Sequence, residues 1–199
     1  MVSVPSRASV VNVFCVREAH VNRVVFDLEL GRDYGLGLQD LDYAGFEVAV
    51  TWDDLDGFRH WRGTQGRALL GYLLEHTAIV GFNLLAYDHR VLAGYLTSGE
   101  RWMIRELKAA TVDLHFLLWR ATGARHSLEE VATNTLGEGK VVPPAGYDPA
   151  LQADYCERDV ELTRDLDDYR RQYGLLYVRG GQAVDLKTDF TTETRRHRE

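Results

Sequence analysis

The chain has 199 residues and a formal net charge of −7, with 45% hydrophobic and 27% charged residues. These values are typical of one globular domain with a full-sized core. The negative charge argues against a broad, sequence-independent grip on nucleic acid. It leaves a nuclease open, because carboxylates that hold metal ions count as negative until the ions bind.

Cysteine usage and hydropathy bear on the compartment. Cys15 and Cys156 match no metal-binding or redox spacing, so a reducing environment is the default. No apolar run reaches the length that crosses a bilayer, and the N-terminus does not have the pattern of a secretory signal. We therefore expect a cytoplasmic protein that makes no membrane contact.

The first third of the chain predicts an antiparallel meander. Residues 10–16 could form a strand or a strap across the sheet, and Arg23–Leu30 is the first well-defined strand. Gly31, Gly35 and Gly37 mark the turn that follows it. Residues 46–52 alternate as a strand, and an Asp-rich turn over 53–57 leads into a third strand over 58–61.

The middle of the chain alternates helices with strands. Residues 65–75 and 87–96 carry apolar side chains at helical spacing, and a short buried strand is predicted over 78–82 between them. Residues 111–119 begin as a strand and continue as a helix. Ser127 and Glu130 predict a capping box, in which each side chain satisfies a free amide of the first helical turn. That helix is expected to end near Leu136, before Gly137.

The longest helix is predicted over Pro149–Tyr173. It follows a loop rich in Gly and Pro over 137–147, and Asp148 before Pro149 provides the acidic N-cap and first-position proline of a helix start. A late strand follows over Leu175–Val178, and 189–199 is a charged tail that we expect to be mobile. Strands first in a meander and then alternating with helices predict an α/β fold with a mixed sheet and helices on both faces.

Two acids interrupt the first strand. Asp27 and Glu29 project from one face of Arg23–Leu30, because successive strand side chains point to opposite faces. Two carboxylates side by side on a core strand repel each other and lose hydration, so a divalent cation is the obvious partner. An edge strand with one wet face would explain the same pattern without a metal.

A third acid, Asp88, follows the predicted strand over 78–82 at the start of the next helix. Ligands gather at such places in open α/β sheets. The alternative is that Asp88 only complements the dipole of the helix.

A fourth acid, Asp159, lies in the apolar stripe of the long helix, four residues after Tyr155 and three before Leu162. An acid on the core-facing side of a helix needs a partner. Arg158 points about 100° away, whereas the Tyr155 hydroxyl lies on the same face. The alternative is that Tyr155 packs in the core and Asp159 is bonded to the backbone.

The three motifs in this order resemble the DEDDy group of 3′–5′ exonucleases. They are Asp27-Leu28-Glu29, Asn83 to Asp88, and Tyr155 to Asp159, and together they span about residues 22–173. The run from Ser127 to Lys140 is also similar to nucleases related to B-family polymerase proofreading domains and to helicase-associated nucleases. The resemblance implies a ribonuclease H-like fold, with a mixed five-stranded sheet and helices on both faces, over one domain at 1–188.

The resemblance also implies a chemistry. Asp27, Glu29, Asp88 and Asp159 would hold two divalent ions, Mg²⁺ or Mn²⁺, and Tyr155 would orient the attacking water. The implied reaction is 3′–5′ exonucleolysis of single-stranded DNA or RNA to nucleoside 5′-monophosphates. The alternatives are a catalytically silent nucleic-acid-binding module and a structure-specific endonuclease on the same fold.

Substrate contacts are implied for Leu30, Asn83 and Tyr87, although Leu30 stands where threonine is frequent in the family. The implied partners are single-stranded 3′ ends and a helicase or repair protein, and the sequence does not specify an oligomeric state.

Four other charged residues are weaker candidates for the site. Lys140, Arg32 and Arg90 could touch phosphates, but a solvated surface charge is the commoner role of such residues. Asp113 is a rival acid, and we expect it to hold a backbone turn.

Overall fold

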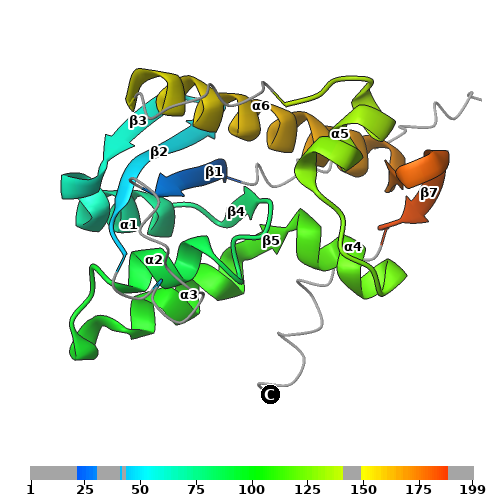
Figure 1. Cartoon of the computed structure of the whole chain (residues 1–199). Helices are drawn as coiled ribbons and strands as arrows, with labels where there is room; N and C mark the ends of the chain where they lie inside the picture. Colours follow the sequence, from blue (N-terminus) through cyan, green and yellow to red (C-terminus); the bar gives the residue numbers. More distant parts are fainter. Residues whose placement is uncertain (1–21, 31–40, 42–43, 141–148, 188–199) are drawn as a thin grey trace, which may run out of the picture.

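The computed structural model describes residues 22–30, 41, 44–140 and 149–187 (Figure 1). Several sequence predictions lie outside these residues. They are the strand or strap over 10–16, the glycine turn at 31–37, the Asp148 cap and the charged tail over 189–199.

Within the described ranges, five strands form one mixed sheet in the order β3-β2-β1-β4-β5. The strands are β1 (Arg23–Leu30), β2 (Phe46–Asp53), β3 (Gly57–Arg62), β4 (Ala78–Gly81) and β5 (Thr111–Asp113). β1, β2 and β3 pair antiparallel, as the predicted meander requires, whereas β4 pairs parallel to both β1 and β5. The carboxyl ends of the three parallel strands therefore meet at one edge of the sheet, where ligands bind in open α/β sheets.

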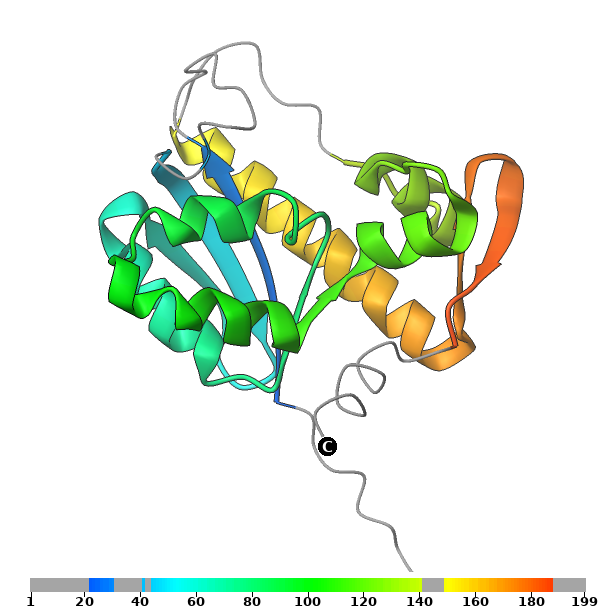
Figure 2. The ribbon, with the colours of Figure 1, turned by 90° about the horizontal axis from the view of Figure 1, so that it is seen from below.

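Helices cover both faces of this sheet, as predicted. The helices are α1 (Gly66–Leu74), α2 (Asp88–Ala93), α3 (Trp102–Ala110), α4 (Leu114–Thr122), α5 (Leu128–Leu136) and α6 (Pro149–Tyr173). Figure 2 shows α1, α2 and α3 in front of the strands and α6 crossing behind them. Among the described residues, no helix is long and apolar enough to span a membrane.

The alternating side chains of β1 supply a core on each face. Val24, Phe26 and Leu28 are buried with residues of α1, α2 and α3. Val25 is buried in a second core with residues of α4, α5 and α6. Asp27 and Glu29 share the face of Val25, so strand geometry directs both acids toward α6.

The helix α6 has the predicted bounds and packs against β1 and β2. Leu162 and Leu166 of its predicted stripe are fully buried, whereas Leu151 and Tyr173, at the two ends of the stripe, are exposed. The stripe therefore covers the sheet only over the middle of the helix, where Asp159 lies.

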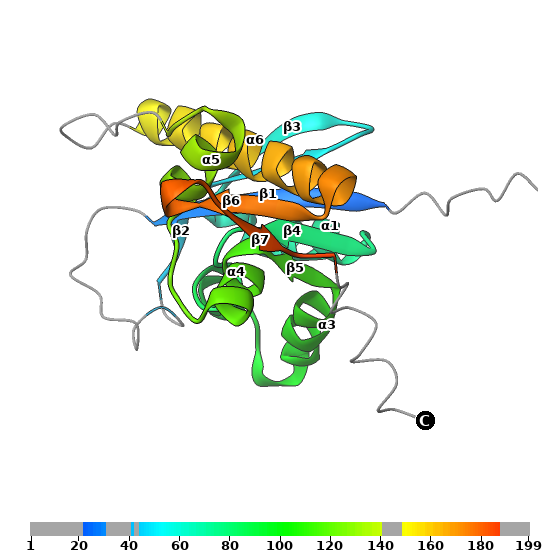
Figure 3. The same cartoon turned by 90° about the vertical axis from the view of Figure 1, so that its right-hand side faces the viewer.

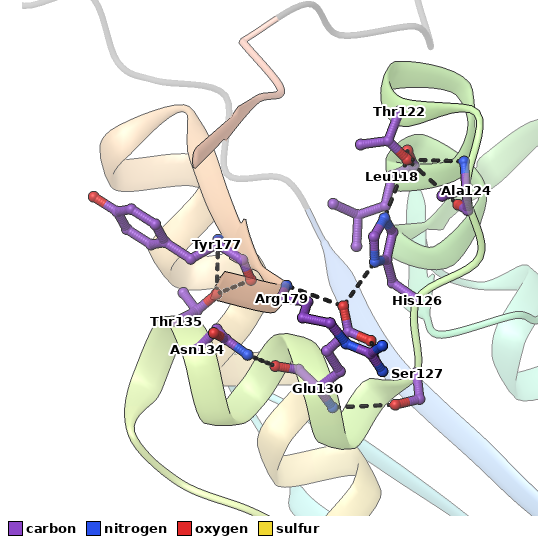
Figure 4. Close-up of polar contacts among 10 residues, drawn as sticks. All are labelled: Leu118, Thr122, Ala124, His126, Ser127, Glu130, Asn134, Thr135, Tyr177 and Arg179. Carbon is purple, nitrogen blue, oxygen red and sulfur yellow. Dashed lines mark hydrogen bonds and ion pairs between the residues drawn. The ribbon is translucent and has the colours of Figure 1, made fainter. Parts of the chain in front are cut away.

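A separate antiparallel hairpin follows α6. It consists of β6 (Leu175–Val178), which the sequence predicts, and β7 (Gln182–Asp185), which it does not. Figure 3 shows this hairpin between α6 and α4. The Thr135 hydroxyl of α5 donates to the carbonyl of Tyr177 at 3.1 Å and accepts from its amide at 2.9 Å (Figure 4). The hairpin is thus fastened to α5 by a reciprocal pair of hydrogen bonds.

The capping box of α5 is only half formed. The Ser127 hydroxyl accepts from the Glu130 amide at 3.1 Å, as predicted, and Gly137 ends the helix with φ = 74°. The Glu130 carboxylate instead lies 2.8 Å from His126 Nδ1 and accepts from the Arg179 amide at 3.0 Å (Figure 4). The prediction that Glu130 caps its own helix was wrong, because His126 and the amide of the distant Arg179 take that carboxylate.

Two other predictions differ from the structure. α2 spans six residues where 87–96 was predicted, and the sequence reasoning overlooked α3 entirely. Only Leu107 of α3 is fully buried, so its apolar periodicity is weak.

Candidate metal centre

Three acids from β1 and α6 converge. One carboxylate oxygen each of Asp27, Glu29 and Asp159 can be chosen so that all three oxygens lie within 4.8 Å of one another. The two β1 acids are half-buried and Asp159 is 5% exposed. Divalent cations bind carboxylate oxygens at about 2.0–2.6 Å, so one ion between them could reach all three.

Contacts from α6 to β1 set this convergence. The Cys156 thiol lies 3.4 Å from the carbonyl oxygen of Asp27 and 3.5 Å from Asp27 Oδ2. One helical turn earlier, Gln152 Nε2 donates to the carbonyl of Leu30 at 3.3 Å. These contacts hold the helix along the strand, so that Asp159 is brought to the two strand acids.

Asp88 lies beside the cluster without belonging to the 4.8 Å group. It is 3% exposed at the start of α2, and the backbone amide of Leu28, between the two strand acids, is close enough to lower its pKa against the effect of burial. Its Oδ1 atom is buried and has no hydrogen-bond partner among the described residues, which is also true of Asp159 Oδ1. Burying a carboxylate oxygen without a partner costs free energy, unless a ligand such as a cation binds it.

The acids raise one another's pKa values. Burial, together with Asp88, Glu29 and Asp159, holds the pKa of Asp27 well above its usual range. Burial and then the charge of Asp159 raise the pKa of Glu29 to about 7. Burial is also the main reason that the pKa of Asp88 rises to about 8. Without a cation the cluster therefore holds protons at neutral pH that isolated carboxyl groups would lose.

Lys140, one of the predicted phosphate contacts, supplies a cation to the cluster. Its ammonium lies 2.5 Å from Asp159 Oδ2 and 4.6 Å from the ring centroid of Tyr155. Although burial disfavours its charged form, contacts with Asp159 and Tyr155 raise the pKa of Lys140 above its ordinary value. Its backbone amide donates to the Glu129 carboxylate, which fixes the end of the loop after α5.

The sequence signal that could have indicated this ion pair is that Asp159, an acid on the core-facing side of a helix, needs a partner. Arg158 does not serve, as predicted, because it pairs with Glu138 at 2.6 Å and Glu161 at 3.0 Å. Lys140 comes from outside the helix, so helical spacing could not reveal it. The other two predicted phosphate contacts are Arg90, a half-buried residue of α2, and Arg32, which lies outside the described residues.

Tyr155 remains a phenol at neutral pH. Burial raises its pKa, a hydrogen bond with Lys140 opposes that rise, and the charge of Asp159 adds to it. A neutral hydroxyl next to the acids is a hydrogen-bond donor and a poor general base.

The predicted substrate contacts surround the same edge of the sheet. Leu30 is half-buried at the end of β1. Burial raises the pKa of Tyr87, and so do the charges of Asp88, Glu29 and Asp27, which places its hydroxyl within the field of these acids.

Asn83 lies in the turn after β4, in a left-handed conformation with φ = 72°. The carboxylate of Asp113 accepts from the amides of Asn83 at 2.8 Å, Leu85 at 2.9 Å and Phe116 at 3.2 Å. The expectation that Asp113 holds a backbone turn is confirmed, and the same carboxylate also caps α4.

The donor set fits a hard divalent cation. The convergent atoms are carboxylate oxygens, which suit Mg²⁺ and Mn²⁺. Among the described residues, the sulfur near these oxygens is the Cys156 thiol, whose pKa is raised well above its usual range by burial and by the charges of Asp27 and Glu29. A neutral thiol is a weak ligand, so the site does not offer the soft thiolate that would favour zinc.

The sequence matches no model of a known protein family and no curated protein. Among solved structures, the fold is similar to the family B DNA polymerase from the hyperthermophilic archaeon Pyrobaculum calidifontis, with a TM-score of 0.55 and 17% sequence identity. The match covers 76% of this chain and 24% of the polymerase chain, so this chain corresponds to about a quarter of that protein. At this identity the likeness concerns the fold, and the mixed five-stranded sheet with helices on both faces fits the predicted ribonuclease H-like fold.

Proposed function

We propose that the chain is a metal-dependent 3′–5′ exonuclease of the DEDDy type, which hydrolyses single-stranded DNA or RNA to nucleoside 5′-monophosphates. The observation that carries this proposal is the convergence of Asp27, Glu29 and Asp159 within 4.8 Å, with Asp88 beside them. The order of the three motifs along the sequence and a fold like that of a family B DNA polymerase support a nucleic-acid substrate. The single domain over 1–188, the cytoplasmic location and a helicase or repair partner stay predictions from the sequence.

In this proposal the four acids hold two divalent cations, Mg²⁺ or Mn²⁺. When bound, the cations supply positive charge that favours attack by water on the terminal phosphodiester and departure of the 3′-oxygen. The acids must lose their protons to bind metal. Because the pKa values of Glu29 and Asp88 are about 7 and 8, the affinity of the site for metal rises with pH through this range.

Lys140 and Tyr155 act on the substrate side of the site. The ammonium of Lys140 neutralises Asp159 in the structure, and it lies close enough to the acids to contact an oxygen of the scissile phosphate once a cation takes over that role. Tyr155 remains protonated at neutral pH and donates a hydrogen bond that orients the attacking water. Leu30, Asn83 and Tyr87 contact the terminal nucleotide at the same edge of the sheet.

A digestion assay tests the proposal. The purified full chain, given Mg²⁺ or Mn²⁺, should shorten a 5′-labelled single-stranded oligonucleotide stepwise from its 3′ end, and EDTA should abolish the reaction. Matched DNA and RNA oligonucleotides read out the sugar preference. Binding without cleavage would support the silent module, and cutting of circular single strands would support an endonuclease.

Two variants make the assay specific. Asp27→Ala should lose at least about 10³-fold in rate while keeping the fold, because it deletes a carboxylate that holds the cations and relieves repulsion among the acids. Asp54→Ala is the matched control, since Asp54 is an exposed acid in the turn between β2 and β3. A folded and fully active Asp27→Ala protein would contradict the assignment.

A further inference from the structure

Two large aromatic side chains of α4 belong to neither hydrophobic core. Phe116 is 37% exposed and Trp119 is 46% exposed, and their ring centroids lie 5.9 Å apart with an angle of 32° between the planes. Exposed aromatic pairs of this kind are uncommon on a solvated surface and mark binding sites. A ligand that offers flat apolar groups would cover them.

The charge around this pair favours an anionic ligand. The guanidinium of Arg120 lies 6.0 Å from the ring centroid of Phe116, and Arg125 is exposed in the turn after the helix. Residues 114–128 contain two arginines and two histidines and no acidic residue, although the chain as a whole has a net charge of −7. Aromatic side chains beside cations in an acid-free segment are complementary to nucleic acid.

This surface adjoins the turn that carries Asn83, one of the proposed substrate contacts. The ring of Phe82, at the end of β4, lies 5.6 Å from the ring of His115. The next residue, Asn83, is a proposed contact of the terminal nucleotide, and Asp113 ties its backbone to the first turn of α4. At about 1.5 Å of rise per residue, Trp119 lies about 9 Å along the helix axis from Asp113.

The exposed Phe116, Trp119 and Arg120 and the half-buried His115 form one face of the helix. At about 100° per residue, His115, Trp119, Phe116 and Arg120 follow one another around roughly 140° of α4. The opposite face, with Leu114, Leu117 and Leu118, is buried in the core beneath α6. The aromatic face therefore cannot turn inward without exposing that core.

Polar contacts fix the far end of α4. The Thr122 hydroxyl lies 3.1 Å from His126 Nε2, and His126 Nδ1 lies 2.8 Å from Glu130 of α5 (Figure 4). Glu130 also accepts from the Arg179 amide of the C-terminal hairpin. The helix is thus held at both ends, and the aromatic face is preorganised, which lowers the cost of binding.

We propose that His115, Phe116, Trp119 and Arg120 form a stacking platform for the bases of single-stranded nucleic acid that precede the 3′-terminal nucleotide. This inference rests on the proposed exonuclease, because it takes the terminal nucleotide to lie at Asn83. Stacking on aromatic faces tolerates any base, and Arg120 with Arg125 attracts the phosphates between the stacked bases.

Binding measurements in EDTA test the platform without hydrolysis. Fluorescence anisotropy of labelled oligothymidylates of three and twelve nucleotides should show that Trp119→Ala weakens binding of the twelve-mer roughly 5- to 150-fold. Binding of the three-mer should not change, and Trp119→Phe should restore most of the affinity. The matched control is Trp102→Ala on α3, which removes a tryptophan that is 50% exposed and should leave both affinities as in the wild type.

An abasic twelve-mer separates stacking from charge. Abasic sites upstream of the three 3′-terminal nucleotides should weaken binding by the wild type as much as Trp119→Ala does, with no further loss when the two changes are combined. The platform is overturned if the wild type does not bind the twelve-mer, if Trp119→Ala binds it normally, or if the two losses multiply. Normal binding by Trp119→Ala is also the result expected if the aromatic pair docks a protein instead.

Hydrolysis by the same variants distinguishes this inference from the proposed function. With Mg²⁺, Trp119→Ala should cleave the three-mer at the wild-type rate and the twelve-mer more slowly at subsaturating concentration. If the wild type cleaves neither oligonucleotide, the exonuclease proposal fails, while the EDTA measurements still decide the platform.

Discussion

Neutralising Glu29 should stabilise the metal-free protein in a pH-dependent way. The pKa of Glu29 is raised from 4.5 to about 7, mainly by burial and by Asp159. Because the folded pKa is raised, the folded state holds the proton more tightly than the unfolded chain does. The stability that protonated Glu29 contributes is therefore fully present below pH 4.5 and is lost as the pH rises through 7.

The size of the effect follows from these two pKa values. At 1.36 kcal/mol per pKa unit, this difference lowers the free energy of unfolding by about 3 kcal/mol at pH 8 and by about 1 kcal/mol at pH 5, relative to a side chain that does not titrate. Glu29→Gln keeps the shape of the side chain and removes the charge. In EDTA its free energy of unfolding should exceed that of the wild type by about 3 kcal/mol at pH 8 and by much less at pH 5.

Urea denaturation at the two pH values measures this difference directly, with Glu106→Gln, an exposed acid of α3, as the control. Mg²⁺ at 100 times its dissociation constant should add about 2.7 kcal/mol to the wild type and less to Glu29→Gln, because the variant has lost one carboxylate. A Glu29→Gln protein that is less stable than the wild type at pH 8 in EDTA, or equally stabilised at both pH values, would refute the reasoning.

Three further variants test individual residues. Lys140→Ala should cost about 2 kcal/mol of unfolding free energy in EDTA, because it leaves Asp159 without its cation, and the loss should vanish in saturating Mg²⁺; an equal loss in both conditions would contradict this role. Tyr155→Phe should lower kcat about 10- to 100-fold with metal affinity unchanged, and a collapse of metal affinity in titration calorimetry would make the residue structural. Asp113→Ala should cost about 2–4 kcal/mol in urea denaturation, since three amides lose their acceptor, and a neutral result would remove its anchoring role.

Local sequence patterns were sufficient where one element decides the structure. The bounds of β1 and α6 agree with the prediction, because an apolar run in the strand and a proline at the start of the helix are local signals. The same logic predicted that Asp27 and Glu29 share a face, and that Asp159 needs a partner.

Contacts between distant segments could not be predicted in this way. Lys140 reaches Asp159 from a loop, and Glu130 accepts from Arg179, which lies 49 residues away. The hairpin strand β7 has one buried side chain, Val184, so it gives little hydrophobic alternation. Even the convergence of the acids depends on the packing of α6 along β1, which the motifs imply only through a family resemblance.

The central claim is that the acids of β1, α2 and α6 exist to hold divalent cations. A crystal of the full chain grown with MnCl₂ tests it most directly, through an anomalous difference map at the manganese edge. We predict strong peaks bounded by the carboxylates of Asp27, Glu29 and Asp159, with Asp88 beside them. A well-ordered site without a peak, with Lys140 still paired to Asp159 at millimolar Mn²⁺, would contradict the account.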